Sequence, residues 1–171
     1  MAEALLRHEL AQLGIEASVS SAGTLPWPGG ASDGARAALG ERGIDLSAHR
    51  SRALDAEMVA RADLVLAMTR NHAWAVASHD DDAATRTFLP AELVRLAGRV
   101  GERAAGEPVD AWAARLAAQR GDPRVPGHPQ DEVADPAGQP LDVYRMTAER
   151  LAGELARVAR LIGGPVGGAE G

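Results

Sequence analysis

The chain has 171 residues and a mass of 17.8 kDa, which is the size of one typical domain. Its formal net charge of −6 gives it no basic footprint of the kind that binds nucleic acid or an anionic membrane surface. The chain contains no Cys, so disulfides, thiolate zinc sites and thiol nucleophiles are excluded from these residues.

The apolar content is 46% of the chain, but Ala supplies much of it, so we expect a thin, Ala-rich core. No apolar run is long enough to cross a bilayer, and the first residues lack the basic-then-apolar order of a signal peptide. The sequence therefore predicts a cytoplasmic protein that acts neither on a membrane nor on nucleic acid.

The first part of the chain predicts alternating helix and short strand. Leu6, Leu10 and Leu13 recur at helical spacing, and Gly14 follows where a left-handed helix cap belongs. The predicted elements are a helix over 1–13, a short strand over 17–22, a loop over 23–30 and a helix from the Ser32 cap to about 42, closed by Gly43.

The middle of the chain continues the alternation. Residues 63–68 (DLVLAM) form an apolar run of strand length, as expected for a strand that is buried on both faces. Asp55 and Thr69 are predicted helix caps. The remaining predicted elements are helices over 56–62, 70–79 and 92–100 and a weak strand over 87–89.

The last part predicts an insertion and a long final helix. Residues 101–134 are rich in Gly, Pro and charge and read as an insertion that contains a helical stretch over 109–120. From 141 to 162, apolar residues recur at alternating spacings of three and four. We therefore predict one α/β domain over 1–163, with a parallel sheet flanked by helices, and a flexible tail over 164–171.

Five segments resemble successive segments of the low-molecular-weight protein tyrosine phosphatases. They are MAEALLRHEL at the start, VSSAGT at 19–24, GIDLSAHRSRAL at 43–54, ADLVLAMTRNH at 62–72 and DPAGQPLDVYR at 135–145. The segments occur in the family's order and span nearly the whole chain.

The resemblance implies a four-stranded parallel sheet in the order 2-1-3-4, with a phosphate loop at the carboxyl end of strand 1. In this family a C-x5-R-S loop provides the nucleophilic Cys and a phosphate-binding Arg. By the resemblance, strand 1 and this loop would precede Met1, so we expect an N-terminally truncated phosphomonoester hydrolase that is inactive as written. The alternative is a non-catalytic pseudophosphatase or a binding remnant.

The resemblance also implies that Asp135 is the general acid, which protonates the leaving group and then assists hydrolysis of the phosphocysteine. Pro136 restricts the backbone before it to extended conformations and helps to orient the carboxylate. Apart from the resemblance, an Asp before Pro is a common turn former. Asp131 is the competing acid, and the alternative for it is a solvated loop charge.

Two further residues match family positions. Ser21 corresponds to a Ser that supports the phosphate loop, although an ordinary strand Ser is an equal alternative. Trp27, in the loop after the first predicted strand, is a candidate for an aromatic substrate wall, and a Trp packed against its own loop is the alternative. Ala137 and Gly138 follow Asp135-Pro136 where the family often has aromatic residues. The implied substrate is a phosphotyrosine protein or a small aryl phosphate, and the family uses no metal or cofactor.

Overall fold

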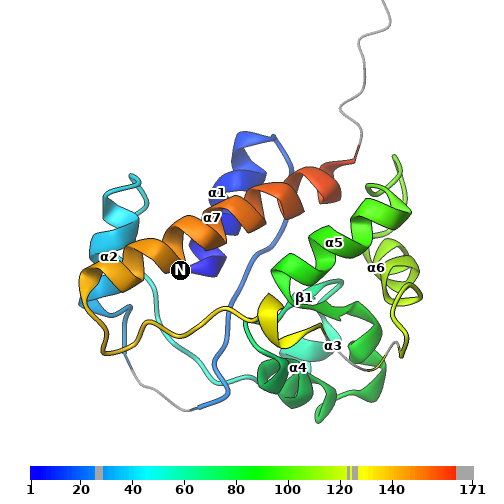
Figure 1. Ribbon diagram of the computed structural model, residues 1–171, viewed down its shortest axis with the longest axis horizontal. Helices are drawn as coiled ribbons and strands as arrows, with labels where there is room; N and C mark the ends of the chain where they lie inside the picture. The colour runs from blue at the N-terminus through cyan, green and yellow to red at the C-terminus, as the bar shows by residue number, and fades with distance from the viewer. Residues whose placement is uncertain (26–28, 123, 125–126, 165–171) are drawn as a thin grey trace, which may run out of the picture.

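The computed structural model describes residues 1–25, 29–122, 124 and 127–164 (Figure 1). Within these residues, three helices precede the first of two short strands, and three more α-helices follow the second strand. The helices are α1 (Ala2–Gln12), α2 (Asp33–Gly40), α3 (Ala56–Ala60), α4 (Arg70–Ala77), α5 (Pro90–Val100), α6 (Val109–Ala117) and α7 (Leu141–Gly163). The strands are β1 (Val65–Leu66) and β2 (Thr87–Phe88), and two short 3₁₀ helices span Asp81–Arg86 and Pro129–Asp131.

The three predicted helix caps are confirmed. The side chains of Ser32, Asp55 and Thr69 each accept a hydrogen bond from the backbone N–H three residues later, in the first turn of α2, α3 and α4 respectively. Each bond satisfies an N–H that would otherwise lack a partner within the helix. The capping residues thus fix where these helices begin.

The sheet is smaller than the sequence predicts. Strands β1 and β2 pair in parallel, with Val65 opposite Thr87 and Leu66 opposite Phe88. The prediction of a strand over 17–22 is wrong, because no described segment lies beside it to complete a ladder. Just after it, Gly23 forms an isolated parallel bridge with Ala53. Strand β1 likewise has a described neighbour on one side only.

Helix α7 organises the core. It packs against α1, α2 and α5, and Figure 1 shows it crossing in front of α1. The predicted apolar stripe is buried from Tyr144 onward, whereas Leu141 at its start is half-buried. The buried residues of α7 are Tyr144, Ala148, Leu151, Ala152, Leu155, Val158, Ala159 and Ile162. Much of the buried core is Ala, as the composition predicts. None of the described helices is both long enough and apolar enough to cross a membrane.

Candidate functional site

The Asp135 loop, defined here as residues 127–138, is fastened to the carboxyl end of β1. The backbone N–H of Val133 donates to the Met68 carbonyl at 2.8 Å. The N–H of Arg70 donates to the Glu132 carboxylate at 3.0 Å. These two bonds tie the loop to the chain between β1 and α4. Carboxyl ends of parallel strands are where open α/β sheets bind their ligands.

Asp131 anchors the loop from within. Its side chain is 8% exposed and accepts hydrogen bonds from the Arg95 guanidinium at 2.7 Å and the His128 backbone N–H at 2.8 Å. The interpretation of Asp131 as a solvated loop charge is therefore wrong. A buried carboxylate that already has two donors is unsuited to delivering a proton to a substrate. Of the two candidate acids, Asp135 is the one whose carboxylate is exposed.

Arg150 of α7 fixes the next part of the loop. Its guanidinium donates to the carbonyls of Asp131 and Glu132, at 3.2 and 2.7 Å, and to the Glu154 carboxylate at 2.9 Å. The loop is thus held to the final helix as well as to the sheet. The sequence does not predict these contacts with the loop, because Arg150 and Glu154 have the spacing of an ordinary i,i+4 surface pair.

A buried ion pair holds the start of the loop. Glu92 and Arg120 have side chains that are 2% and 4% exposed, and the Glu92 carboxylate also accepts from the Gly127 N–H at 2.8 Å. Arg120 donates to the carbonyls of Ala84 and Thr87 and stacks over the Phe88 ring. This pair joins the segment after α6 to α5 and β2. Sequence patterns do not reveal this pair, because the partners lie 28 residues apart.

Asp135 itself is exposed. Its carboxylate accepts a hydrogen bond from the Ala137 N–H at 2.9 Å, the geometry of a turn-forming Asp. Pro136 is buried, whereas Ala137 and Gly138 are exposed. The positive φ of 75° at Gly138 completes the turn. The carboxylate is therefore oriented by its own loop and remains accessible to a ligand.

Ser21 lies in a second cluster, at the N-terminal end of α1. Its hydroxyl donates to the Glu3 carboxylate, which also accepts from Arg7, and its carbonyl accepts from the Arg52 Nε at 2.9 Å. Burial alone would raise the pKa of Glu3. The hydrogen bonds from Ser21 and Arg7, with the charges of Arg7 and His49, outweigh burial and lower that pKa below its usual value. Glu3 is another residue that the sequence analysis missed.

The structure does not join the predicted site residues to one another. Among the described residues, no hydrogen bond or ion pair links Asp135 to Ser21. Trp27 lies outside the described residues. No group of three or more potential metal ligands occurs in the described part of the chain.

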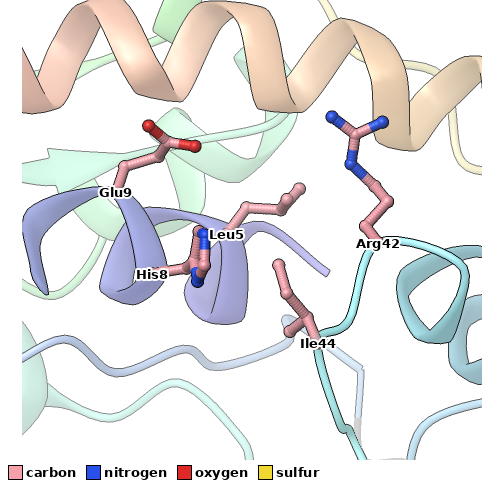
Figure 2. A pocket seen from close by; sticks show the side chains of 5 residues that line it. All are labelled: Leu5, His8, Glu9, Arg42 and Ile44. Atoms are coloured by element: carbon pink, nitrogen blue, oxygen red, sulfur yellow. The ribbon is translucent and has the colours of Figure 1, made fainter. Parts of the chain in front are cut away.

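A hollow of about 290 Å³ lies elsewhere, between α1 and the segment that follows α2. Figure 2 shows its lining, with Leu5, His8 and Glu9 on α1 and Arg42 and Ile44 opposite them. It contains none of the predicted site residues. Arg42 is also engaged by Glu149 of α7, at 2.7 Å. We therefore place the candidate site at the Asp135 loop and the Ser21 cluster, not in this hollow.

Comparison with known proteins identifies relatives over almost the full chain. A protein-arginine-phosphatase of Bacillus subtilis (strain 168) is 30% identical over 161 residues, which are 94% of this chain and 85% of the relative. An arginine phosphatase from Geobacillus stearothermophilus has a solved structure with 32% identity and a TM-score of 0.60, covering 92% of this chain and 80% of its own.

A low molecular weight protein tyrosine phosphatase from Bacillus subtilis has a solution structure with 30% identity and a TM-score of 0.67. That match covers 95% of this chain and 87% of the relative. Residues 1–97 match the family described as low molecular weight phosphotyrosine protein phosphatase. These matches confirm the resemblance and the α/β fold class that were expected from the sequence. The chain belongs to the low-molecular-weight phosphotyrosine protein phosphatase family.

Proposed function

We propose that this chain forms the greater part of a protein phosphatase in which Asp135 is the general acid. The observation that carries the proposal is the attachment of the Asp135 loop to the carboxyl end of β1, through the Val133–Met68 hydrogen bond of 2.8 Å. The buried Asp131 and Arg150 contacts support it, because they hold the loop while the carboxylate of Asp135 stays accessible. A fixed, accessible carboxylate suits general acid catalysis.

The nucleophile is proposed to come from a segment that is not among these 171 residues, since they contain no Cys. The incomplete sheet supports this. Residues 17–22 form no strand within the described structure, and β1 pairs with β2 alone. In the family, strand 1 lies between the strands that correspond to these two segments. A strand inserted there would end beside Ser21 and Met68, and its following loop would reach both the Ser21 cluster and the Asp135 loop.

The chemistry follows from these parts. A Cys thiolate attacks phosphorus, the bond to the leaving oxygen breaks, and Asp135 gives that oxygen its proton. The resulting Asp135 carboxylate then takes a proton from water as the water attacks the phosphocysteine, which releases phosphate and the thiolate. Ser21 is proposed to support the phosphate loop. Its hydroxyl donates its proton in a hydrogen bond to the Glu3 carboxylate, so its oxygen is left to accept a bond from the loop. Trp27 stays a prediction for a substrate wall.

We propose a phosphotyrosine protein or an aryl phosphate as the substrate. A phosphoarginine protein is the second candidate, because two relatives with at least 30% identity are arginine phosphatases. The small Ala137 and Gly138 after Asp135-Pro136 also provide no aromatic wall for a phenyl ring. Parallel assays with phosphotyrosine and phosphoarginine peptides of one sequence would separate the two. We also propose a cytoplasmic location.

The first test is the intact mass of the protein from its native source. A mass above 17.8 kDa, with a C-x5-R-S sequence in the added segment, is the expected result. A native mass of 17.8 kDa would mean that the chain has no thiol nucleophile, and the non-catalytic alternative would replace the enzyme.

The second test concerns Asp135 in the heavier, Cys-containing polypeptide. We expect Asp135→Ala to slow the hydrolysis of aryl phosphates with poor leaving groups by about 10² to 10⁴. Substrates whose leaving groups need no protonation should be affected much less. Steady-state rates across a leaving-group series provide the measurement, and an unchanged rate with poor leaving groups would remove the acid role from Asp135.

A further inference from the structure

Two arginines border the candidate site without a carboxylate partner. Arg52 lies beside Ser21, and Arg70 lies beside the Asp135 loop. No described carboxylate forms an ion pair with either guanidinium. By contrast, Arg86, Arg95 and Arg120 each form an ion pair with a carboxylate. The two cations at the site are therefore available to a ligand of opposite charge.

Arg70 has an unused donor. Its backbone N–H is fixed by the Glu132 carboxylate at 3.0 Å, so the residue has a defined place beside the loop. Its side-chain Nε is nevertheless buried and has no hydrogen-bond partner among the described atoms. A buried donor without an acceptor is unfavourable, and an incoming oxyanion would relieve that cost. A guanidinium also binds carboxylates in a bidentate manner.

Arg52 is held in position and exposed. Its Nε donates to the Ser21 carbonyl at 2.9 Å, and its own carbonyl accepts from the Gly23 N–H at 2.9 Å. The stem is therefore fixed, and the structure shows no partner for the terminal nitrogens within the described residues. Arg52 contacts segment 17–22 at Ser21, and Arg70 follows β1 at the start of α4. One arginine therefore lies beside each of the two segments between which the phosphate loop is proposed to lie.

We propose that Arg52 and Arg70 select phosphoproteins that have acidic residues next to the phosphorylated residue. Each guanidinium binds a flanking carboxylate, while the phosphorylated residue itself occupies the site between them. This specificity rests on the proposed phosphatase function for its biological meaning. The binding of acidic residues needs no nucleophile, however, and is measurable on the chain as it stands.

The test uses two nine-residue peptides with a central phosphotyrosine, one flanked by Glu and one by Gln. Their affinity for the 171-residue chain is measured by NMR titration at low salt, following the Nε–Hε signals of Arg52 and Arg70. The variants are Arg52→Gln and Arg70→Gln, with Arg157→Gln as the matched control. Arg157 lies exposed on α7 and has no ion pair within the described chain.

We expect the Glu-flanked peptide to bind more tightly and to shift both Nε–Hε signals. Each site variant should weaken its binding about two- to fivefold, the range of partly exposed ion pairs, and Arg157→Gln should not. Raising the salt should remove the difference between the peptides. Circular dichroism of each variant confirms that it is folded, and the signal shifts in the unaltered chain need no variant at all.

Equal affinity for the two peptides, or unshifted Arg52 and Arg70 signals, would overturn the proposal. An equal loss in Arg157→Gln would also overturn it, because the attraction would then be nonspecific. Signals that respond to phosphotyrosine alone, whatever the flanks, would replace flanking carboxylates with the phosphoryl group as the ligand. If the heavier, Cys-containing polypeptide has no turnover while the 171-residue chain still passes this test, only the phosphatase function is overturned.

Discussion

Asp131 and Asp135 show how environment separates two carboxylates four residues apart. Asp131 is buried against Arg95, whereas Asp135 faces solvent and is oriented by the Ala137 N–H. The sequence could mark Asp135 through its Asp-Pro neighbourhood, but it could not show that Asp131 is buried. Its partner Arg95 is 36 residues away, on another element. Pairings at such separations depend on tertiary packing, which local patterns do not encode.

Removing the charge of Asp131 should destabilise the fold. Asp131→Asn keeps the side chain's size but weakens the bonds to Arg95 and to the His128 N–H. We expect a loss of about 1 to 3 kcal/mol in the free energy of unfolding, measured in urea. Asp81→Asn is the control, because Asp81 is exposed and should change stability by less than about 0.5 kcal/mol. An equal effect in both variants would contradict the anchoring role of Asp131.

Glu3 should make stability depend on pH. Its pKa is lower in the folded chain, so its contribution is present above the unfolded value of about 4.3 and is lost as the pH falls through the folded pKa. We therefore expect Glu3→Gln to be less stable than the unaltered chain at pH 7, with the difference shrinking below about pH 4.3. Urea unfolding from pH 7 to pH 3 measures this. A difference that is constant with pH would rule out the ionised Glu3 as its cause.

At the scale of elements, the sequence predicts helices better than the sheet. Ser32, Asp55 and Thr69 define helix starts through local bonds, and the periodicity of α7 follows from its buried stripe. Both features depend on residues that are close in the sequence, so they can be predicted from the sequence. The segment 17–22 has strand-like composition but no neighbour to pair with. Whether a segment becomes a strand depends on a partner elsewhere, and composition alone cannot supply it.

The packing of α2 on α7 depends on a glycine. A Cβ added to Gly34 would lie 2.5 Å from the Tyr144 ring, so Gly34→Ala must push the two helices apart or displace the ring. We expect a loss of about 1 to 3 kcal/mol in thermal or urea unfolding. Gly153→Ala, within α7, is the matched control. Its Cβ meets open space, and it should be neutral or stabilising by up to about 1 kcal/mol.

A pair of substitutions with equal effects would contradict this packing. If Gly34→Ala were as stable as Gly153→Ala, the contact between α2 and the Tyr144 ring would be too loose to matter. A destabilised Gly34→Ala with a stable Gly153→Ala would confirm that α2 depends on close approach to α7.

At the scale of the whole molecule, α7 unites the core while the sheet is left open. The backbone N–H groups of residues 16–22 donate no hydrogen bond within the described structure, whereas α7 is helical over 23 residues. Amide hydrogen exchange should therefore be fast over 16–22 and slowest at the buried residues Leu151 and Leu155 of α7. Mass spectrometry of exchanged peptides provides the measurement. Strong protection over 16–22 would mean that a partner strand is already in place.

The open position of the sheet also bears on how this chain behaves in a crowded solution. Unpaired peptide groups on strand edges are templates for another extended chain, and native proteins usually cover them with charge, proline or a neighbouring element. Strand β1 (Val65–Leu66) is apolar and follows the single charge of Asp63, so its sequence offers little of that protection. Because β1 has a described neighbour on one side only, we expect the 171-residue chain to associate with itself through edge-to-edge pairing.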